Sequence, residues 1–361
     1  MIKLQPRREP SELMVYISPI LAGILTLMTG AILFAVLGYN SFTALYTFLV
    51  APIQDSQGIS ELLVKASPIL MCAIGLAVAY RANVWNIGAE GQLLMGALVG
   101  SAVALQFPDS ESKSTLILVL ISGVLAGMAW AGIAAFLKTK FNTNEILTTI
   151  MLNYIALNLL QYAVHGPLKD PDGYSFPESA PFSAGATLPT LLEDGRVHIG
   201  FALAVIAVLI IWFLVSKSFL GFQMKVMGMD ERAAKFAGYP EKKLTWLVLL
   251  ISGGLAGLAG VCEVTGPIGQ LVPNVSPGYG YAAIIVAFLG RLHPVGILIA
   301  SLLMALIYLG GELAQIKLGT PAALTLLFQG MLLFYLLACD VLIRYQLIKV
   351  PHSSTQAQGA N

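Results

Sequence analysis

Residues 80–96 read YRANVWNIGAEGQLLMG, and this stretch decides how the rest of the chain is interpreted. An apolar run arrives at its start, polar and small residues fill its middle, and a second apolar run leaves its end. At membrane depth, polar side chains and irregular backbone are tolerated only where they are buried in protein or line a watery cavity. The stretch is therefore a candidate gate or solute path, although a loop whose glycines cap two helices explains it equally well. Its candidate path residues are Asn83, Asn86, Glu90 and Gln92.

Composition places the chain in a membrane. Its 361 residues are 57% hydrophobic and 11% charged, with a mean hydropathy of +0.81. Soluble domains carry about 25% charged residues, so we expect an all-α polytopic membrane protein in contact with the lipid bilayer. A net charge of +1 offers no basic field to a nucleic acid, and no nucleic-acid partner is expected. The cysteines lie in apolar runs without metal-ligand spacing, so no metal site is expected either.

Apolar runs predict about ten transmembrane helices, since a spanning helix needs about 20 mostly apolar residues. Two of them are short or broken, near 80–96 and 278–294. In the second, only 281–290 is continuously apolar, and ten residues at about 1.5 Å each do not cross a bilayer. Paired interruptions in two halves of a chain are typical of a transporter pathway. The expected helices cover 14–37, 62–80, 92–107, 115–137, 145–164, 201–215, 244–264, 281–290, 295–311 and 321–341.

Charge distribution sets the expected orientation. Most of the 20 Lys and Arg residues fall in segments that are interior if the N-terminus is cytoplasmic. The exceptions are Lys65, Lys113, Lys169, Arg196 and Lys317. We therefore expect both termini in the cytoplasm and one transmembrane domain over 1–361. It has a cytoplasmic N-terminus (1–13), an outer loop (166–200), a cytoplasmic segment (216–243) and a disordered tail (350–361).

A small-residue pattern occurs twice, as ISGVLAG over 121–127 and as ISGGLAG over 251–257. The two copies suit inverted repeats, because the helices that carry them run in opposite directions under the expected topology. Small residues also recur wherever transmembrane helices pack closely, and this second interpretation is favoured.

Catalytic chemistry is not expected in this chain. A phosphate-binding loop needs Gly-Lys followed by Ser or Thr, and the dipeptide Gly-Lys does not occur. The histidines are scattered through loops and the tail, with no nucleophile and base in a recognisable pattern. The sequence thus indicates a protein that is not an enzyme, and any ATP that drives it binds another chain.

The expected cytoplasmic segment contains GMDERAAKFAGYPEKK over 228–243. Asp230 is placed to cap a short helix, Glu231 lies in its first turn, and Gly238 ends it. The small side chains of Ala233 and Ala234 keep the helix thin. Such a helix suits insertion into a partner's groove, although a solvated loop helix fits the same residues.

The expected helix over 145–164 carries Asn153 near its middle, followed by Tyr154. Burying an amide at mid-span is costly, so the position is informative. Such amides and aromatic faces suit an uncharged, hydroxyl-rich or nucleobase-like solute. Hydrogen bonding between helices explains them equally well.

Three stretches resemble one family: AYRANVWNIGAEGQLLMG (79–96), NTNEILTTIMLNYIA (142–156) and GMDERAAKFAGYPEKKL (228–244). They look like permease subunits of bacterial ABC importers, in the branched-chain amino acid, ribose and simple-sugar permease family. The similarity is greatest to the nucleoside-importer branch and covers about 62–341.

The resemblance implies a ten-helix permease in the bacterial inner membrane that carries nucleosides or related small polar solutes. Simple sugars and branched-chain amino acids are the alternative solutes, and an ion-coupled secondary transporter is the alternative class. The implied partners are a cytoplasmic ATPase that holds ATP and Mg, a second homologous permease, and a periplasmic or lipoprotein substrate-binding protein. No cofactor is implied in this chain. Residues 230–238 would be the coupling helix, where Arg232 replaces the glutamate of the usual Glu-Ala-Ala-x3-Gly pattern.

Overall fold

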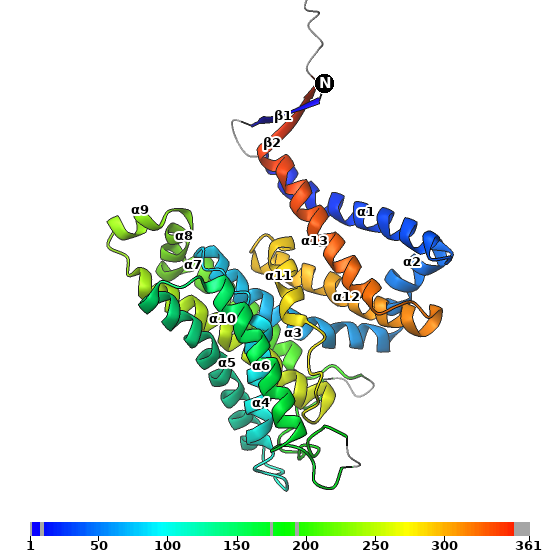
Figure 1. Ribbon diagram of the computed structural model, residues 1–361, viewed down its shortest axis with the longest axis vertical. Coiled ribbons are helices and arrows are strands. Elements are labelled where there is room, and N and C mark those ends of the chain that lie inside the picture. Colours follow the sequence, from blue (N-terminus) through cyan, green and yellow to red (C-terminus); the bar gives the residue numbers. More distant parts are fainter. Residues whose placement is uncertain (1, 8–10, 174–175, 192–194, 350–361) are drawn as a thin grey trace, which may run out of the picture. The chain divides into compact units, whose positions relative to one another are not determined.

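The computed structural model describes residues 2–7, 11–173, 176–191 and 195–349. This part of the chain is almost wholly helical (Figure 1). The helices are α1 (Glu12–Val36), α2 (Ser41–Leu49), α3 (Ser56–Arg81), α4 (Ala89–Ala104), α5 (Lys113–Phe141), α6 (Glu145–His165), α7 (Ile199–Lys217), α8 (Phe219–Met229), α9 (Glu231–Phe236), α10 (Glu241–Glu263), α11 (Tyr279–Leu289), α12 (Pro294–Leu318) and α13 (Ala323–Arg344). A 3-10 turn, Ala51–Ile53, and a π turn, Val264–Ile268, complete the helical elements.

Eight of the described helices are long and apolar enough to cross a membrane: α1, α3, α5, α6, α7, α10, α12 and α13. Helices α4 and α11 are apolar but shorter. Together they are the ten segments expected from the sequence, with the two short ones where the pattern predicted them. The all-α polytopic class is confirmed.

The chain divides into two compact units, and the first comprises Met1–Tyr46 and Leu318–Asn361. In it α1 packs along α13, where the Ser18 hydroxyl donates a hydrogen bond of 2.5 Å to Asp340. The rings of Phe34 and Phe328 lie 5.7 Å apart between the same helices. Strand β1 (Ile2–Pro6) pairs antiparallel with β2 (Tyr345–Lys349), which the sequence did not lead us to expect. The tail over 350–361 lies outside the described residues.

The second unit, Thr47–Lys317, is built around α3 and α10 (Figure 1). Every residue of α3 from 66 to 80 is buried. Helix α10 packs against α3, α4 and α5 through glycines. A Cβ on Gly127 would lie 2.2 Å from the carbonyl oxygen of Gly253, and a Cβ on Gly96 would lie 2.3 Å from that of Gly257. The two small-residue patterns therefore face each other, which confirms their packing role.

The loops of this second unit gather at two ends. At one end the predicted outer segments meet, since Gly185 donates to the Ser110 carbonyl (2.8 Å) and Leu188 to that of Thr265 (2.9 Å). At the other end the guanidinium of Arg81 donates to the Leu292 carbonyl at 2.7 Å, and both residues belong to predicted interior segments. The grouping agrees with the expected topology. Which end faces the cytoplasm stays a prediction from the positive charges.

Candidate functional site

Two short helices begin inside the second unit and run to opposite ends of it. Helix α4 leads to the end that carries Ser110, and α11 leads to the end where Arg81 contacts Leu292. Their N-termini meet, because a Cβ on Gly280 would lie only 2.3 Å from the backbone nitrogen of Glu90. Only glycine allows this approach. We call this place the meeting point: the first turns of α4 and α11 and the side chains that bond to them.

Asn86 ties the start of α4 to α10. Its side chain is 0% exposed, and its Oδ1 accepts the backbone N–H of Gly88 at 2.8 Å. Its Nδ2 donates to Gln92 Oε1 (3.0 Å) and to the Ser252 hydroxyl (2.9 Å). A buried amide whose bonds are all made stabilises and orients its surroundings, whereas an unmet one is costly. Asn86 and Gln92 thus fix the geometry of the interruption.

Asn153 of α6 makes a second link. It is 2% exposed, and its Oδ1 accepts the Gly91 backbone N–H at 2.8 Å. Its Nδ2 donates to the Ile87 carbonyl (2.9 Å) and to the Tyr281 hydroxyl (3.3 Å). One amide therefore holds the α3–α4 linker, the first turn of α4 and the first turn of α11.

Glu90 closes the meeting point from the α4 side. Glu90 is 7% exposed, and its Oε2 accepts the backbone N–H of Gly280 at 2.7 Å. It also hydrogen-bonds with Ser276, whose hydroxyl accepts the Tyr279 backbone N–H at 2.9 Å. A carboxylate is favourable here because the N-terminus of a helix carries partial positive charge.

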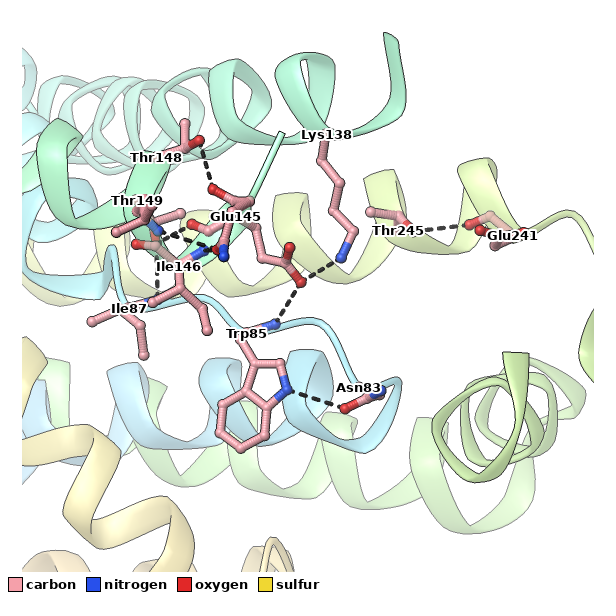
Figure 2. Close-up of polar contacts among 12 residues, drawn as sticks. Asn83, Trp85, Ile87, Lys138, Glu145, Ile146, Thr148, Thr149, Glu241 and Thr245 are labelled. Carbon is pink, nitrogen blue, oxygen red and sulfur yellow. Dashed lines mark hydrogen bonds and ion pairs between the residues drawn. The ribbon is translucent and has the colours of Figure 1, made fainter. Parts of the chain in front are cut away.

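The start of α6 contacts the linker between α3 and α4, residues 82–88 (Figure 2). Glu145 pairs with Lys138 at the end of α5 and accepts the backbone N–H of Trp85 at 3.4 Å. One turn later the Thr149 hydroxyl accepts the Ile87 backbone N–H at 3.1 Å (Figure 2). The linker is thus attached to α6 at successive turns.

The predicted path residues divide into two groups. Asn86, Glu90, Gln92 and Asn153 come together in or beside the meeting point. The other two lie apart: Asn83 is exposed and accepts the Trp85 indole N–H at 3.1 Å, and Tyr154 is 57% exposed. The part that these residues play in solute passage stays a prediction.

Sequence reasoning missed several members of this network. Ser252 lies inside ISGGLAG, whose small residues indicate close helix packing and not a hydrogen bond to Asn86. Ser276 opens Ser-Pro-Gly before a short apolar run, and these residue types indicate a turn at the start of a helix. Thr149 and Tyr281 carry no local pattern, since their partners lie far along the chain.

The predicted docking helix is present as α9. Asp230 caps it, with Oδ1 accepting the Arg232 backbone N–H at 2.8 Å. Gly238 follows with a φ of +77°, a left-handed conformation that favours glycine. Glu231, Arg232 and Ala233 are exposed, whereas Ala234 is buried.

The most exposed large side chain of this segment was not anticipated. Phe236, the last residue of α9, is 94% exposed. A polar cavity of about 300 Å³ opens beside the same segment, between the end of α5 and the start of α10. It is lined by Lys138, Thr139, Lys140, Asn142, Glu231, Glu241, Lys242 and Thr245. Lys138 therefore lines the cavity beside α9 and also forms the ion pair with Glu145.

Residues 58–337 match the family described as branched-chain amino acid transport system, permease component. The chain belongs to this permease family. It is 33% identical to the glucose ABC transporter permease protein TsgB13 of Haloferax volcanii, over 96% of this chain and 93% of that one. It is 31% identical to the guanosine ABC transporter permease protein NupP of Bacillus subtilis, over 95% and 97% of the two chains. A second guanosine permease of that bacterium, NupQ, is 25% identical over 66% of this chain and 77% of its own.

These likenesses cover the second unit and most of the first. With the eight candidate spans, they show a multi-pass membrane permease component of an ABC importer. The meeting point and the α9 segment are thus parts of a permease.

Proposed function

We propose that this permease forms the translocation path of an ATP-driven importer for nucleosides or related small polar solutes. The observation that carries the proposal is the 31% identity to the guanosine permease NupP along nearly the whole of both chains. The polar residues of the meeting point are its candidate path residues. Amide groups such as Asn153 suit solutes that offer hydroxyl and ring-nitrogen partners rather than full charges.

A simple sugar is the second candidate solute. The relative TsgB13 is a glucose permease and is 33% identical to this chain. Sugars and nucleosides share hydroxyl groups, so one set of amide and hydroxyl partners can serve either. Branched-chain amino acids, named in the family description, come third.

The permease would work with other chains. A cytoplasmic ATPase would bind ATP and Mg, and a periplasmic or lipoprotein substrate-binding protein would deliver the solute. A second permease subunit is supported by the similarity of this chain to both NupP and NupQ of one bacterium. The assembly would lie in a bacterial inner membrane, and this chain itself would hydrolyse nothing.

Docking of the ATPase would use α9. An exposed aromatic side chain on a short capped helix suits a groove in a partner, and Phe236 is 94% exposed. Glu231 of α9 borders the same cavity as Lys138. Lys138 pairs with Glu145, which accepts the Trp85 N–H. Displacement of α9 would therefore reach the α3–α4 linker through this chain of contacts.

Purification from native membranes in mild detergent, with identification of every co-purifying chain, tests the assembly. Recovery of an ATPase and a second permease is expected. Uptake of labelled guanosine and glucose by vesicles that contain the assembly then ranks the two solutes. Solute transport by the isolated chain on an ion gradient, without ATP, would contradict the proposal and favour a secondary transporter.

A further inference from the structure

An apolar groove of about 500 Å³ lies between α5, α7 and α10 in the second unit. Every residue that lines it is apolar, and most are leucines and isoleucines of α7 and α10. Its floor is widened by Gly254, which has no side chain and faces Met128 of α5. The groove therefore suits an occupant made of hydrocarbon.

The groove has one closed end. There α7 begins against the end of α10, since a Cβ on Gly200 would lie 3.3 Å from the Cβ of Cys262. The groove starts one turn further on, between Leu203 and Leu258, and continues along α7 to Leu214. At about 1.5 Å per residue, Leu203 to Leu214 extends over about 16 Å. This length is close to half of the hydrocarbon core of a bilayer, which is about 30 Å thick, so the groove has the depth of one leaflet.

The other end of the groove carries positive charge. Lys217 follows the last lining residue of α7 by three positions, and Lys243 precedes the first lining residue of α10 by four. Positions three or four apart share a helix face, so both lysines continue the lining stripes, and both are exposed. The contact of Gly200 with α10 makes the two helices antiparallel, which places both lysines at the same end. Glu241, in the first turn of α10, lines instead the polar cavity beside α9.

A tryptophan marks the level of this charged end. Trp246 lies in the first turns of α10, and its indole N–H donates to the Thr139 hydroxyl at 2.9 Å. Tryptophan is enriched where a membrane protein passes through the lipid headgroups. Lys243 lies one turn before Trp246 and so stands at headgroup level, at the end of the unit expected to be cytoplasmic.

We propose that the groove is a binding site for an anionic phospholipid, with one acyl chain between α7 and α10 and the headgroup phosphate beside Lys217 and Lys243. Basic pockets between transmembrane helices bind anionic lipid headgroups in this way. The bound lipid fills the space that α7 leaves against α5 and α10 and so stabilises the position of α7. This site is separate from the solute path and independent of which solute is carried.

The size of the groove favours an acyl chain over a helix of a second permease. A helix is at least about 10 Å across with its side chains, so 16 Å of helix occupies about 1,250 Å³. The groove holds about 500 Å³. An acyl chain is much narrower than a helix and bends to follow the groove.

Thermal melting of the delipidated chain in detergent tests the choice of headgroup. Dioleoyl phosphatidylglycerol is expected to raise the melting temperature by several degrees more than dioleoyl phosphatidylcholine, which has the same acyl chains. Inorganic phosphate, which lacks acyl chains, is expected to raise it by no more than sodium chloride at equal ionic strength. Equal stabilisation by the two lipids, or by phosphate alone, would overturn the proposal.

A charge-matched pair of double variants locates the headgroup. In Lys217→Gln with Lys243→Gln, the advantage of phosphatidylglycerol over phosphatidylcholine is expected to disappear. Lys225→Gln with Lys235→Gln removes the same charge from exposed positions of α8 and α9 and is expected to keep that advantage. The opposite result would place the anionic lipid elsewhere on the chain.

Native mass spectrometry of the protein purified from membranes tests the groove itself. Ile210 lines the groove and its neighbour Leu209 does not, although each is 59% exposed. Ile210→Trp is expected to reduce the bound phosphatidylglycerol several-fold, whereas Leu209→Trp keeps it at the wild-type level. Equal lipid content in the two variants would overturn the proposal. Loss of a co-purifying permease from Ile210→Trp, with its lipid content unchanged, would also overturn it and would identify the groove as a protein interface.

Discussion

The meeting point and the α9 segment look alike in the sequence and differ in the structure. Both are short polar interruptions between apolar runs. At the meeting point the polar atoms turn inward, with Asn86 0% and Asn153 2% exposed and their amides bonded to backbone and side chains. In α9 the polar side chains of Glu231, Arg232 and Lys235 turn outward, together with an apolar one, Phe236, which is 94% exposed. Polarity in a membrane sequence thus marks where a helix is interrupted, and burial decides whether the interruption is internal architecture or a docking surface.

The largest loss of stability is expected from Asn86→Leu. Leucine has a similar size but leaves the Gly88 N–H, Gln92 and Ser252 without their partner. Each buried polar group left unmet costs about 1–3 kcal/mol. Thermal melting of the purified chain measures the effect, with Asn158→Leu, at an exposed position of α6, as the matched control. Equal melting temperatures for both variants would remove the distinction between buried and exposed asparagines.

Acid is expected to lower the stability of the second unit through His198. This residue caps α7 by accepting the Gly200 backbone N–H at 3.1 Å. Burial, and secondarily the charge of Arg196, lowers the pKa of His198 from 6.5 to about 4. The unfolded chain therefore binds this proton more readily. The contribution of neutral His198 to the free energy of unfolding is fully present above about pH 6.5. It is lost as the pH falls toward about 4, and the loss is roughly 3 kcal/mol at most.

Melting curves between pH 7.5 and pH 4.5 check this effect, since the pH dependence should flatten in His198→Asn. Asparagine keeps an acceptor for the cap but does not titrate. A variant that loses stability with acid as steeply as the wild type would show that other groups are responsible.

Smaller losses are expected from Gly96→Ala, whose Cβ would lie 2.3 Å from the Gly257 carbonyl oxygen between α4 and α10. Overpacking of this kind costs about 1–3 kcal/mol. Gly330→Ala in α13 is the control, because a Cβ there would meet none of the described atoms within 4 Å. Alanine is also the better helix former, so the control should melt at the wild-type temperature or slightly above it. The reverse order would refute the close packing of α4 on α10.

The smallest effect on stability, with a large effect on assembly, is expected from Phe236→Ala. Its side chain is almost fully exposed, so the melting temperature should stay within about 1 °C of the wild type. Recovery of the ATPase in co-purification should fall at least several-fold. Lys235→Ala, at the neighbouring exposed position, is the control. Undiminished ATPase recovery with Phe236→Ala would place the docking surface elsewhere.

The sequence predicts the parts of this fold that depend on local patterns. Apolar run length predicts α3 and α10 as spans and α11 as too short, and Asp230 predicts the start of α9. Partners far apart in the chain are not accessible in this way. Strand β1 pairs with β2 at the opposite end of the sequence, and Asn86 bonds to Ser252 in α10. The exposure of Phe236 also escapes a local pattern, because an aromatic residue beside alanines is equally typical of a buried face.

The most direct test of the link between the two regions is the amount of solute imported per ATP hydrolysed by the purified assembly when Lys138 is replaced. Lys138→Met removes the pairing with Glu145 while leaving Phe236 and the meeting point untouched. The account predicts that the ATPase still binds and hydrolyses ATP, whereas solute import per ATP falls at least fivefold. An unchanged ratio would contradict the route from α9 through Lys138 and Glu145 to the α3–α4 linker.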